Sequence, residues 1–403
     1  MITALTSQAS EQDEIAHASV GAPDLSALRI AFVSGNYNCL RDGANRAQNM
    51  LVRYLLDHGA AVRVYSPTCD TPAFAPVGDL VSIPSRPLPF GRKEYRLAWH
   101  LSRGVRHDVA AFAPNLFHIS LPFLHGSSAL KLARRMGVPV VAAMHTRFET
   151  YPRYYRLGLF ERPLLAALRR FYRACDHVVA PCESAARTME RQGLGTNVGI
   201  WTRGVDTDLF SPARRDEAWR RGHGLMGDAP VIAFLGRLVL EKGLGDFAAT
   251  IARLRAVGEV FRVLVIGDGP ARAEFAKALG DGVFVGFQHG EGLARAIASA
   301  DILLNPSSTE AFGNVSLEAM ACGLPVVAAD ATGNSNLVVD GLTGALVRPG
   351  DVDGYVGALR RYLGSSSLRQ AHAFNALARS KVFSWDRASE GIARTYLAAL
   401  AKA

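Results

Sequence analysis

The sequence predicts an α/β protein made of two doubly wound, Rossmann-like domains that face each other across a cleft. Short β-branched or apolar runs alternate with amphipathic, helix-like segments, which is typical of a parallel sheet covered by helices. The alternation begins again after residue 229, so the two halves repeat an architecture. A length of 403 residues also exceeds the roughly 250–300 residues that one core usually serves.

The chain is expected to begin with a disordered tail over residues 1–27, followed by the first domain over 28–210. The tail has no basic segment followed by an apolar stretch, so we expect no secretory signal and a cytoplasmic location. The strand-like runs of this domain are 28–34, 61–67, 115–120, 138–146 and 177–182, and its clearest helix-like segments are 44–59 and 127–137.

The second domain is expected over residues 211–382, with the junction near 202–215. Its strand-like runs are 230–236, 261–267, 282–287, 300–307 and 324–330. Residues 383–403 form one amphipathic pattern, a helix that is a candidate to pack back against the first domain. The five cysteines are scattered without a CxxC pair, so neither a disulfide framework nor a zinc site is expected.

Basic residues are concentrated in one part of the first domain. The net charge is +9 overall, and residues 86–173 hold 16 Lys and Arg against 4 Asp and Glu. Two segments, 86–107 and 153–173, mix these cations with Leu, Phe, Tyr and Trp at roughly helical spacing. They are either ordinary surface helices or a face that lies on anionic lipid, for which Arg92, Lys93 and Arg96 are the candidates. No motif that reads nucleic acid accompanies the charge, so nucleic acid is not an expected partner.

The glycine pattern does not support a dinucleotide-binding dehydrogenase. Such an enzyme needs GxGxxG directly after a strand, and the first strand is followed by SGNYNCLRDG. The nearest match, Gly267 to Arg272, lacks the third glycine and is explained as a turn between a strand and a helix.

Charged residues of the second domain follow its predicted strands in a suggestive order. Arg237 and Lys242 share one loop, and Glu310 and Glu318 lie eight positions apart in a later segment. The carboxyl ends of parallel strands are where open α/β sheets bind ligands. Two cations on one loop can stabilise a departing diphosphate, while carboxylates can accept hydrogen bonds from the hydroxyls of a sugar and a ribose.

A candidate anion site precedes the helix that is expected to begin near Ser316. Phe312, Gly313 and Asn314 would present free backbone N–H groups there, and Gly313 would let a ligand approach the backbone. Glu310 in the loop suits the transferred sugar, and Glu318, expected about two turns into the helix, suits the ribose. Together these residues point to a nucleotide diphosphate sugar.

GRLVLEKG followed by EAFGNVSLEAMACGLPVV, with its E-x7-E pattern, resembles glycosyltransferase family 4. The resemblance implies the GT-B fold, a retaining reaction without a metal or other cofactor, and a nucleotide-sugar donor held mainly by the second domain. Arg237 and Lys242 would contact the diphosphate. Gly43 is a further donor-binding candidate, in a loop that reads Asp42–Gly43–Ala44 where the family often has Gly-Gly. Asn334–Ser335–Asn336 also departs from the Gly-Pro-Glu-like residues that often follow ATG.

His145 follows a predicted buried strand, a position where a histidine taken alone is more often structural than catalytic. The resemblance implies that it lies near the donor sugar and the reacting centre. The stretch that begins at His145, H-T-x-F-x-x-Y-x-x-Y-Y, is similar to family members that glycosylate lipids, such as diacylglycerol mannosyl- and sulfoquinovosyltransferases.

We therefore expect a retaining transfer of a hexosyl group to a lipid acceptor by a peripheral protein on the inner face of the cytoplasmic membrane. A UDP-sugar is the favoured donor, and GDP-mannose is the other candidate. The alternatives are a soluble or polysaccharide-precursor acceptor and, more remotely, a GT-B nucleotide-sugar 2-epimerase. The full set of charged candidates argues against a non-catalytic sugar-nucleotide-binding module.

Overall fold

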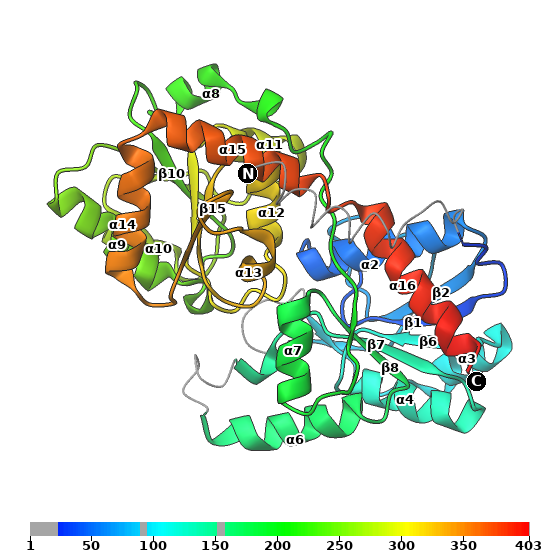
Figure 1. Cartoon of the computed structure of the whole chain (residues 1–403). Helices are drawn as coiled ribbons and strands as arrows, with labels where there is room; N and C mark the ends of the chain where they lie inside the picture. Colours follow the sequence, from blue (N-terminus) through cyan, green and yellow to red (C-terminus); the bar gives the residue numbers. More distant parts are fainter. Residues whose placement is uncertain (1–22, 89–94, 151–157, 403) are drawn as a thin grey trace.

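The computed structural model describes residues 23–88, 95–150 and 158–402, which form two lobes joined by two crossings of the chain (Figure 1). Each lobe contains a parallel sheet flanked by helices, as the alternating sequence pattern predicts. Within the described residues, no helix combines the length and the apolar character needed to cross a membrane.

The first sheet has seven strands in the order β3-β2-β1-β6-β7-β8-β9, and all of its pairs are parallel. Its strands are β1 (Arg29–Val33), β2 (Ala61–Ser66), β3 (Asp79–Ser82), β6 (Leu116–Ile119), β7 (Val140–Ala143), β8 (His177–Ala180) and β9 (Gly199–Ile200). β6 and β7 are buried at every position, which explains why they read as continuous apolar runs.

Helices of the first lobe cover both faces of this sheet. They are α2 (Gly43–Asp57), α3 (Arg103–Phe112), α4 (His125–Met136), α6 (Glu161–Tyr172) and α7 (Glu183–Arg191), with short 3₁₀ turns η1 (Phe148–Thr150) and η2 (Gly158–Phe160). Asp42 caps α2, since its carboxylate accepts a hydrogen bond from the Asn45 backbone N–H.

The second sheet has six parallel strands in the order β12-β11-β10-β13-β14-β15. They are β10 (Val231–Leu235), β11 (Arg262–Ile266), β12 (Val283–Phe284), β13 (Ile302–Asn305), β14 (Val326–Ala329) and β15 (Gly344–Val347). The accompanying helices are η3 (Pro212–Arg214), α8 (Glu217–Gly222), η4 (Leu240–Lys242), α9 (Leu244–Ala256), α10 (Arg272–Leu279), α11 (Gly290–Ala298), α12 (Asn314–Ala321), α13 (Asn334–Leu337), α14 (Val352–Leu363) and α15 (Ser366–Ser380).

The last helix, α16 (Trp385–Leu400), leaves the second lobe and packs on α2 of the first. Trp385, Ile392 and Tyr396 belong to the same apolar cluster as residues of the first sheet. The two crossings touch each other, because the Val205 backbone N–H donates to the Phe383 carbonyl at 3.0 Å. A Cβ on Gly204 would lie 2.3 Å from the Trp385 backbone nitrogen, so this close contact requires glycine.

The structure changes three details of the sequence-based expectations. Leu25 is fully buried and donates its backbone N–H to the His58 carbonyl, so the ordered chain starts before residue 28. The segment 86–107 is not one helix, because it contains the two-residue strands β4 (Arg86–Pro87) and β5 (Arg96–Leu97) before α3 begins. Strands β3, β9 and β15 were not predicted, since each is short or only partly buried.

Candidate functional site

The strand order reverses between β1 and β6 in the first sheet and between β10 and β13 in the second. Loops that leave the sheet at such a switch point diverge and open a crevice for ligands. Side chains from the two lobes meet there. Arg46 of α2 and Glu318 of α12 form an ion pair at 3.2 Å, and Arg237 donates to the Tyr95 hydroxyl at 3.3 Å. The site is therefore built by both lobes.

Lys242 and Glu310 lie together in the second lobe. Lys242 ends η4 after strand β10, and its Nζ donates to Glu310 Oε1 at 2.6 Å. Their side chains are 29% and 11% exposed, so the pair lies at the surface of the cleft and remains accessible. Gly243 adopts a φ of 73°, and a Cβ there would lie 2.8 Å from the Pro306 carbonyl. Glycine thus permits the close approach that brings the two loops together.

Arg237 lies on the same loop as Lys242, as the sequence requires, but it has different contacts. Its guanidinium lies 3.4 Å from Glu241 and reaches Tyr95 in the first lobe. The side chain is 40% exposed. Arg237 is therefore accessible to an anionic ligand and already spans from one lobe to the other.

α12 begins at Asn314, so Glu318 is its fifth residue and lies little more than one turn into the helix, not the expected two turns. Its carboxylate is paired with Arg46, a residue that the sequence analysis did not identify. Burial raises the pKa of Glu318 to about 7, and the Arg46 cation partly opposes this shift. Nothing near Arg46 in the sequence marks it, since its partner is 272 positions away.

The first residues of α2 and α12 approach each other across the cleft. A Cβ on Gly43 would lie 1.9 Å from Asn314 Nδ2, so no side chain fits at position 43 in this arrangement. Gly313, the residue before α12, has a φ of 99° and provides no side-chain cap. The N-terminus of α2 is capped by the Asp42 carboxylate, whereas α12 has no side-chain cap, so the N-terminus of α12 is the one that favours an anion.

Residues 332–334 form hydrogen bonds that stabilise the Gly313 loop and the start of α12. Thr332 donates its hydroxyl to the Glu310 carbonyl at 2.7 Å, and the Gly333 N–H donates to the same oxygen at 2.9 Å. Buried Asn334 accepts from the Ser316 hydroxyl at 2.9 Å. Asn334, which departs from the family pattern, is therefore a buried support for the loop that carries Glu310.

His145 follows β7 on the first-lobe side of the cleft. Its Nδ1 lies 3.0 Å from Nη2 of Arg203, and its Nε2 is buried and has no hydrogen-bond partner in the part of the chain that the structure describes. Burial lowers the pKa of His145 well below its ordinary value, and the Arg203 cation lowers it further. The imidazole is therefore neutral at physiological pH. Arg203 was not a predicted site residue.

Two further contacts connect the His145 side to the Glu310 loop. The Cys182 thiol, which follows β8, donates to the Ala311 carbonyl at 3.2 Å. Ser184 donates to the Thr332 carbonyl at 2.5 Å and accepts from the Asn336 amide at 2.6 Å. The carboxyl edge of β7 and β8 thus lies against the loop that carries Glu310.

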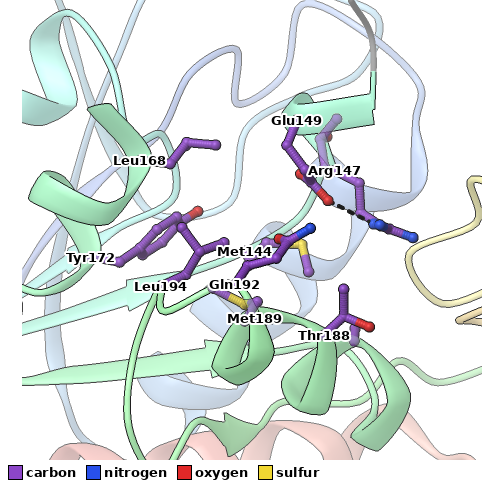
Figure 2. Close-up of a pocket in the computed structure, with 11 residues that line it drawn as sticks. Met144, Arg147, Glu149, Leu168, Tyr172, Thr188, Met189, Gln192 and Leu194 are labelled. Atoms are coloured by element: carbon purple, nitrogen blue, oxygen red, sulfur yellow. Dashed lines mark hydrogen bonds and ion pairs between the residues drawn. The ribbon is translucent and has the colours of Figure 1, made fainter. Parts of the chain in front are cut away.

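A mainly apolar pocket lies beside His145, between α6 and α7 (Figure 2). Met144, Leu168 and Met189 line it, and the ion pair between Arg147 and Glu149, at 2.8 Å, closes one side. Within the described residues, the carbonyl oxygen of the Gln192 side chain is buried there without a hydrogen-bond partner. The pocket lies in the first lobe next to the site, and His145 itself does not line it.

Of the three residues expected on a membrane face, the structure describes only Arg96. Arg92 and Lys93 lie outside the described residues, as does part of the tyrosine-rich stretch after His145. Arg96 is half-buried, and its guanidinium donates to the hydroxyl and the carbonyl of Ser85. Arg96 therefore holds the β4–β5 hairpin and is not a free surface cation.

The described residues contain no group of three or more His, Cys, Asp and Glu side chains placed to hold a metal ion. Lys242 and Glu310 are paired with each other, as are Arg46 and Glu318.

Both lobes match known glycosyltransferase families. Residues 41–209 match the family described as Glycosyltransferase Family 4, and residues 229–365 match Glycosyl transferases group 1. The chain is 30% identical over 356 residues to the sulfoquinovosyl transferase SQD2 of Arabidopsis thaliana. This match covers 86% of this chain and 69% of SQD2. It is 32% identical over 345 residues to a GDP-mannose-dependent alpha-mannosyltransferase of Mycolicibacterium smegmatis, covering 82% of this chain and 87% of that relative.

The fold is also that of solved glycosyltransferases. Sucrose-phosphate synthase from Thermosynechococcus elongatus superimposes with a TM-score of 0.77 at 20% identity, covering 93% of this chain and 99% of that one. HepE of Anabaena, solved with UDP and glucose, gives 0.69 at 19% identity, covering 92% and 99%. The architecture is thus the GT-B fold, and the protein is a glycosyltransferase. The chain belongs to glycosyltransferase family 4.

Proposed function

We propose that this protein transfers a hexosyl group from a nucleotide diphosphate sugar with retention of anomeric configuration. The observation that carries this proposal is the pairing of Lys242 with Glu310 beside the N-terminus of α12, facing the His145 side of the cleft. A cation and a carboxylate at one point can serve the two parts of such a donor, its diphosphate and its sugar.

The second lobe would hold the donor. Arg237 and Lys242 would receive the diphosphate, aided by the N–H groups at the Gly313 turn, while Glu310 would accept hydrogen bonds from the transferred sugar. Glu318 would accept from the two ribose hydroxyls in its ionised form. Both carboxylates are already ion-paired, so donor binding would exchange these partners.

The reaction breaks the bond between C1 of the sugar and the diphosphate oxygen while an acceptor oxygen bonds to C1 from the same side. The acceptor proton passes to the departing diphosphate. Arg237 and Lys242 would stabilise the negative charge that develops on that group, which is the role a metal has in other transferases. We therefore infer that turnover needs no divalent cation.

The direct test incubates the full chain with a panel of nucleotide sugars and a membrane lipid extract, with glycosylated products detected by mass. Nuclear magnetic resonance of the product gives the anomeric configuration, and inversion would reject the retaining mechanism. Turnover should persist in excess EDTA, and strict dependence on added Mn²⁺ or Mg²⁺ would contradict the assigned role of the two cations.

A UDP-sugar is the favoured donor, with GDP-mannose as the alternative. One relative is named for dependence on GDP-mannose, which supports the alternative. A structural neighbour was solved with UDP. Competition between UDP and GDP for the same site, measured by calorimetry, decides between them.

A lipid at the inner face of the cytoplasmic membrane is the favoured acceptor. Leu159 and Phe160, directly before α6, are 94% and 62% exposed. Arg162 and Arg170 on α6 are exposed too, so apolar side chains of η2 and basic side chains of α6 lie along one continuous segment that borders the pocket of Figure 2. Shallow insertion of the apolar pair would let the arginines meet lipid phosphates.

Vesicle binding tests this surface. Leu159→Ser combined with Phe160→Ser should weaken binding to vesicles of phosphatidylglycerol and reduce lipid glycosylation in parallel. Phe374→Ser is the matched control, because Phe374 is 73% exposed but lies on α15 of the second lobe. Salt should reduce binding of the parent as the Debye length falls from ~10 Å to ~3 Å.

A soluble acceptor is the second candidate. Several relatives are named D-inositol 3-phosphate glycosyltransferases, one of them 29% identical over 91% of this chain. If the double serine variant binds anionic vesicles as well as the parent does, a soluble phosphorylated acceptor becomes the better assignment.

A further inference from the structure

Arg203 is a buried arginine whose position is determined by its own loop. It is 3% exposed and lies just after the buried Trp201 at the end of the first sheet. Its Nη1 donates to the Trp201 carbonyl at 2.7 Å and to the Thr202 carbonyl at 3.0 Å. The guanidinium carbon lies 4.7 Å from the centre of the Trp201 ring. These contacts orient the guanidinium without any help from His145.

The second terminal nitrogen of this guanidinium, Nη2, decides the state of His145. Nη2 lies 3.0 Å from His145 Nδ1, and an arginine can only donate hydrogen bonds. Nδ1 must therefore be the acceptor, which leaves the single ring proton of a neutral imidazole on Nε2. A protonated imidazole would present an N–H to Arg203 and bring two cations together.

Among the described residues, the groups around His145 do not reverse this choice. Trp201 meets the imidazole edge-on, with ring centres 5.2 Å apart. His118 on β6 is neutral, since burial lowers its pKa to about 3, and it binds Ser120 and Tyr396. Cys182, close to Arg203, is a thiol whose pKa is raised by burial. The described residues contain no partner for His145 Nε2, which is itself buried.

We propose that Arg203 is a positioning residue that sets His145 as a neutral Nε2–H donor directed at an oxygen of the bound sugar nucleotide. The effect on catalysis rests on the function proposed above, whereas the tautomer of His145 does not depend on it. A donor that is already oriented strengthens a hydrogen bond in the transition state without reorganisation. Outer partners that orient a ligand in this way typically matter by about 10–100-fold.

The tautomer can be measured without any substrate. Nitrogen-15 labelling of the 11 histidines, with His145→Gln to assign the His145 signals, distinguishes protonated from unprotonated ring nitrogens. We expect an unprotonated Nδ1 and a protonated Nε2 near neutral pH. In Arg203→Met the Nδ1–H form should appear, while Arg203→Lys, whose ammonium can still donate, should show less of it. A wild-type signal from Nδ1–H, or an unchanged tautomer in Arg203→Met, would overturn the proposal.

A double-mutant cycle tests the consequence. Arg203→Met should lower kcat/KM by roughly 10–100-fold, with kcat falling more than the donor KM changes. In a His145→Ala background the same change should cost nothing further, whereas a structural role would give additive losses. Arg220→Met is the control, because Arg220 is 4% exposed in the second lobe and donates to a backbone carbonyl as Arg203 does.

The two experiments separate this proposal from the proposed function. If no nucleotide sugar supports transfer, the function is rejected, and the resonance measurement still decides the tautomer. If transfer occurs and the losses at Arg203 and His145 are additive, the function stands and the positioning role is rejected.

Discussion

The two sides of the cleft hold their polar groups in opposite ways. On the first-lobe side, Arg203 is 3% exposed and bound by carbonyls of its own loop, and His145 is neutral. On the second-lobe side, Lys242 is 29% exposed and its partner Glu310 is itself a candidate for the sugar. The first-lobe side therefore presents a buried, neutral hydrogen-bond donor, whereas the second-lobe side presents accessible ion pairs.

This difference indicates that the two sides respond differently when the donor binds. The His145 side needs no rearrangement to present its hydrogen bond, because its contacts are internal to one lobe. The second-lobe groups must exchange their present partners for the donor, and one of these partners, Arg46, comes from the opposite lobe. Losses from variants on the second-lobe side should therefore appear in donor binding as well as in turnover.

The largest effect is expected for the diphosphate cations. Lys242→Ala or Arg237→Ala should lower kcat/KM by roughly 10²–10³, the scale for loss of one preorganised charge-stabilising group. Steady-state kinetics with varied donor measure this loss. Lys277→Ala, at an exposed lysine on α10, is the control. Near-normal activity in both cleft variants would remove this loop from the site.

The contact between the two helix N-termini gives the next effect. Gly43→Ala would place a methyl 1.9 Å from Asn314 Nδ2, so either the Asn314 side chain must turn away from its place in the candidate donor site or α2 must shift. A displacement of about 1 Å can cost on the order of 10² in turnover, and we expect a loss of that size in kcat/KM. Gly104→Ala is the control, since a Cβ there meets nothing within 4 Å. Equal activity of the two variants would mean that the lobes do not need this approach.

The pH dependence of donor binding tests the Glu318 carboxylate. Its pKa is raised to about 7, whereas the ribose hydroxyls would bind the ionised form. UDP binding should therefore weaken as pH falls below about 7, by up to about tenfold per pH unit, with proton release at neutral pH. Calorimetry in buffers of different ionisation enthalpy measures both quantities. Glu318→Gln should bind more weakly with a flat profile, and a flat profile in the parent would contradict the ribose role.

The smallest effect is expected for Arg46. Arg46→Met removes the cation that lowers the pKa of Glu318, so the pH midpoint for UDP binding should move upward. Because the Arg46 side chain is 35% exposed, its contribution to the free energy of unfolding should stay within about 1 kcal/mol. A change in Tm without a change in the binding midpoint would show that the ion pair only joins the lobes.

The sequence by itself determined the two parallel sheets and the strand ends that carry Arg237, Lys242, Glu310 and His145. Buried parallel strands must be apolar throughout, and their loops must supply the polar groups, so both signals are local. The glycosyltransferase family was also readable from the segments around Lys242 and Glu318. Short strands such as β9 and the hairpin of Arg96 were missed, because two residues have no periodicity to detect.

Only the tertiary structure decided which partners these residues have. Arg46 pairs with Glu318, which is 272 positions away in the sequence, and Arg203 contacts His145, which is 58 positions away. No local sequence pattern extends over such separations. The proton position on His145 follows from that second contact, since a guanidinium can donate but not accept. The return of α16 to the first lobe likewise depends on an apolar surface that exists only after the first sheet and α2 have packed together.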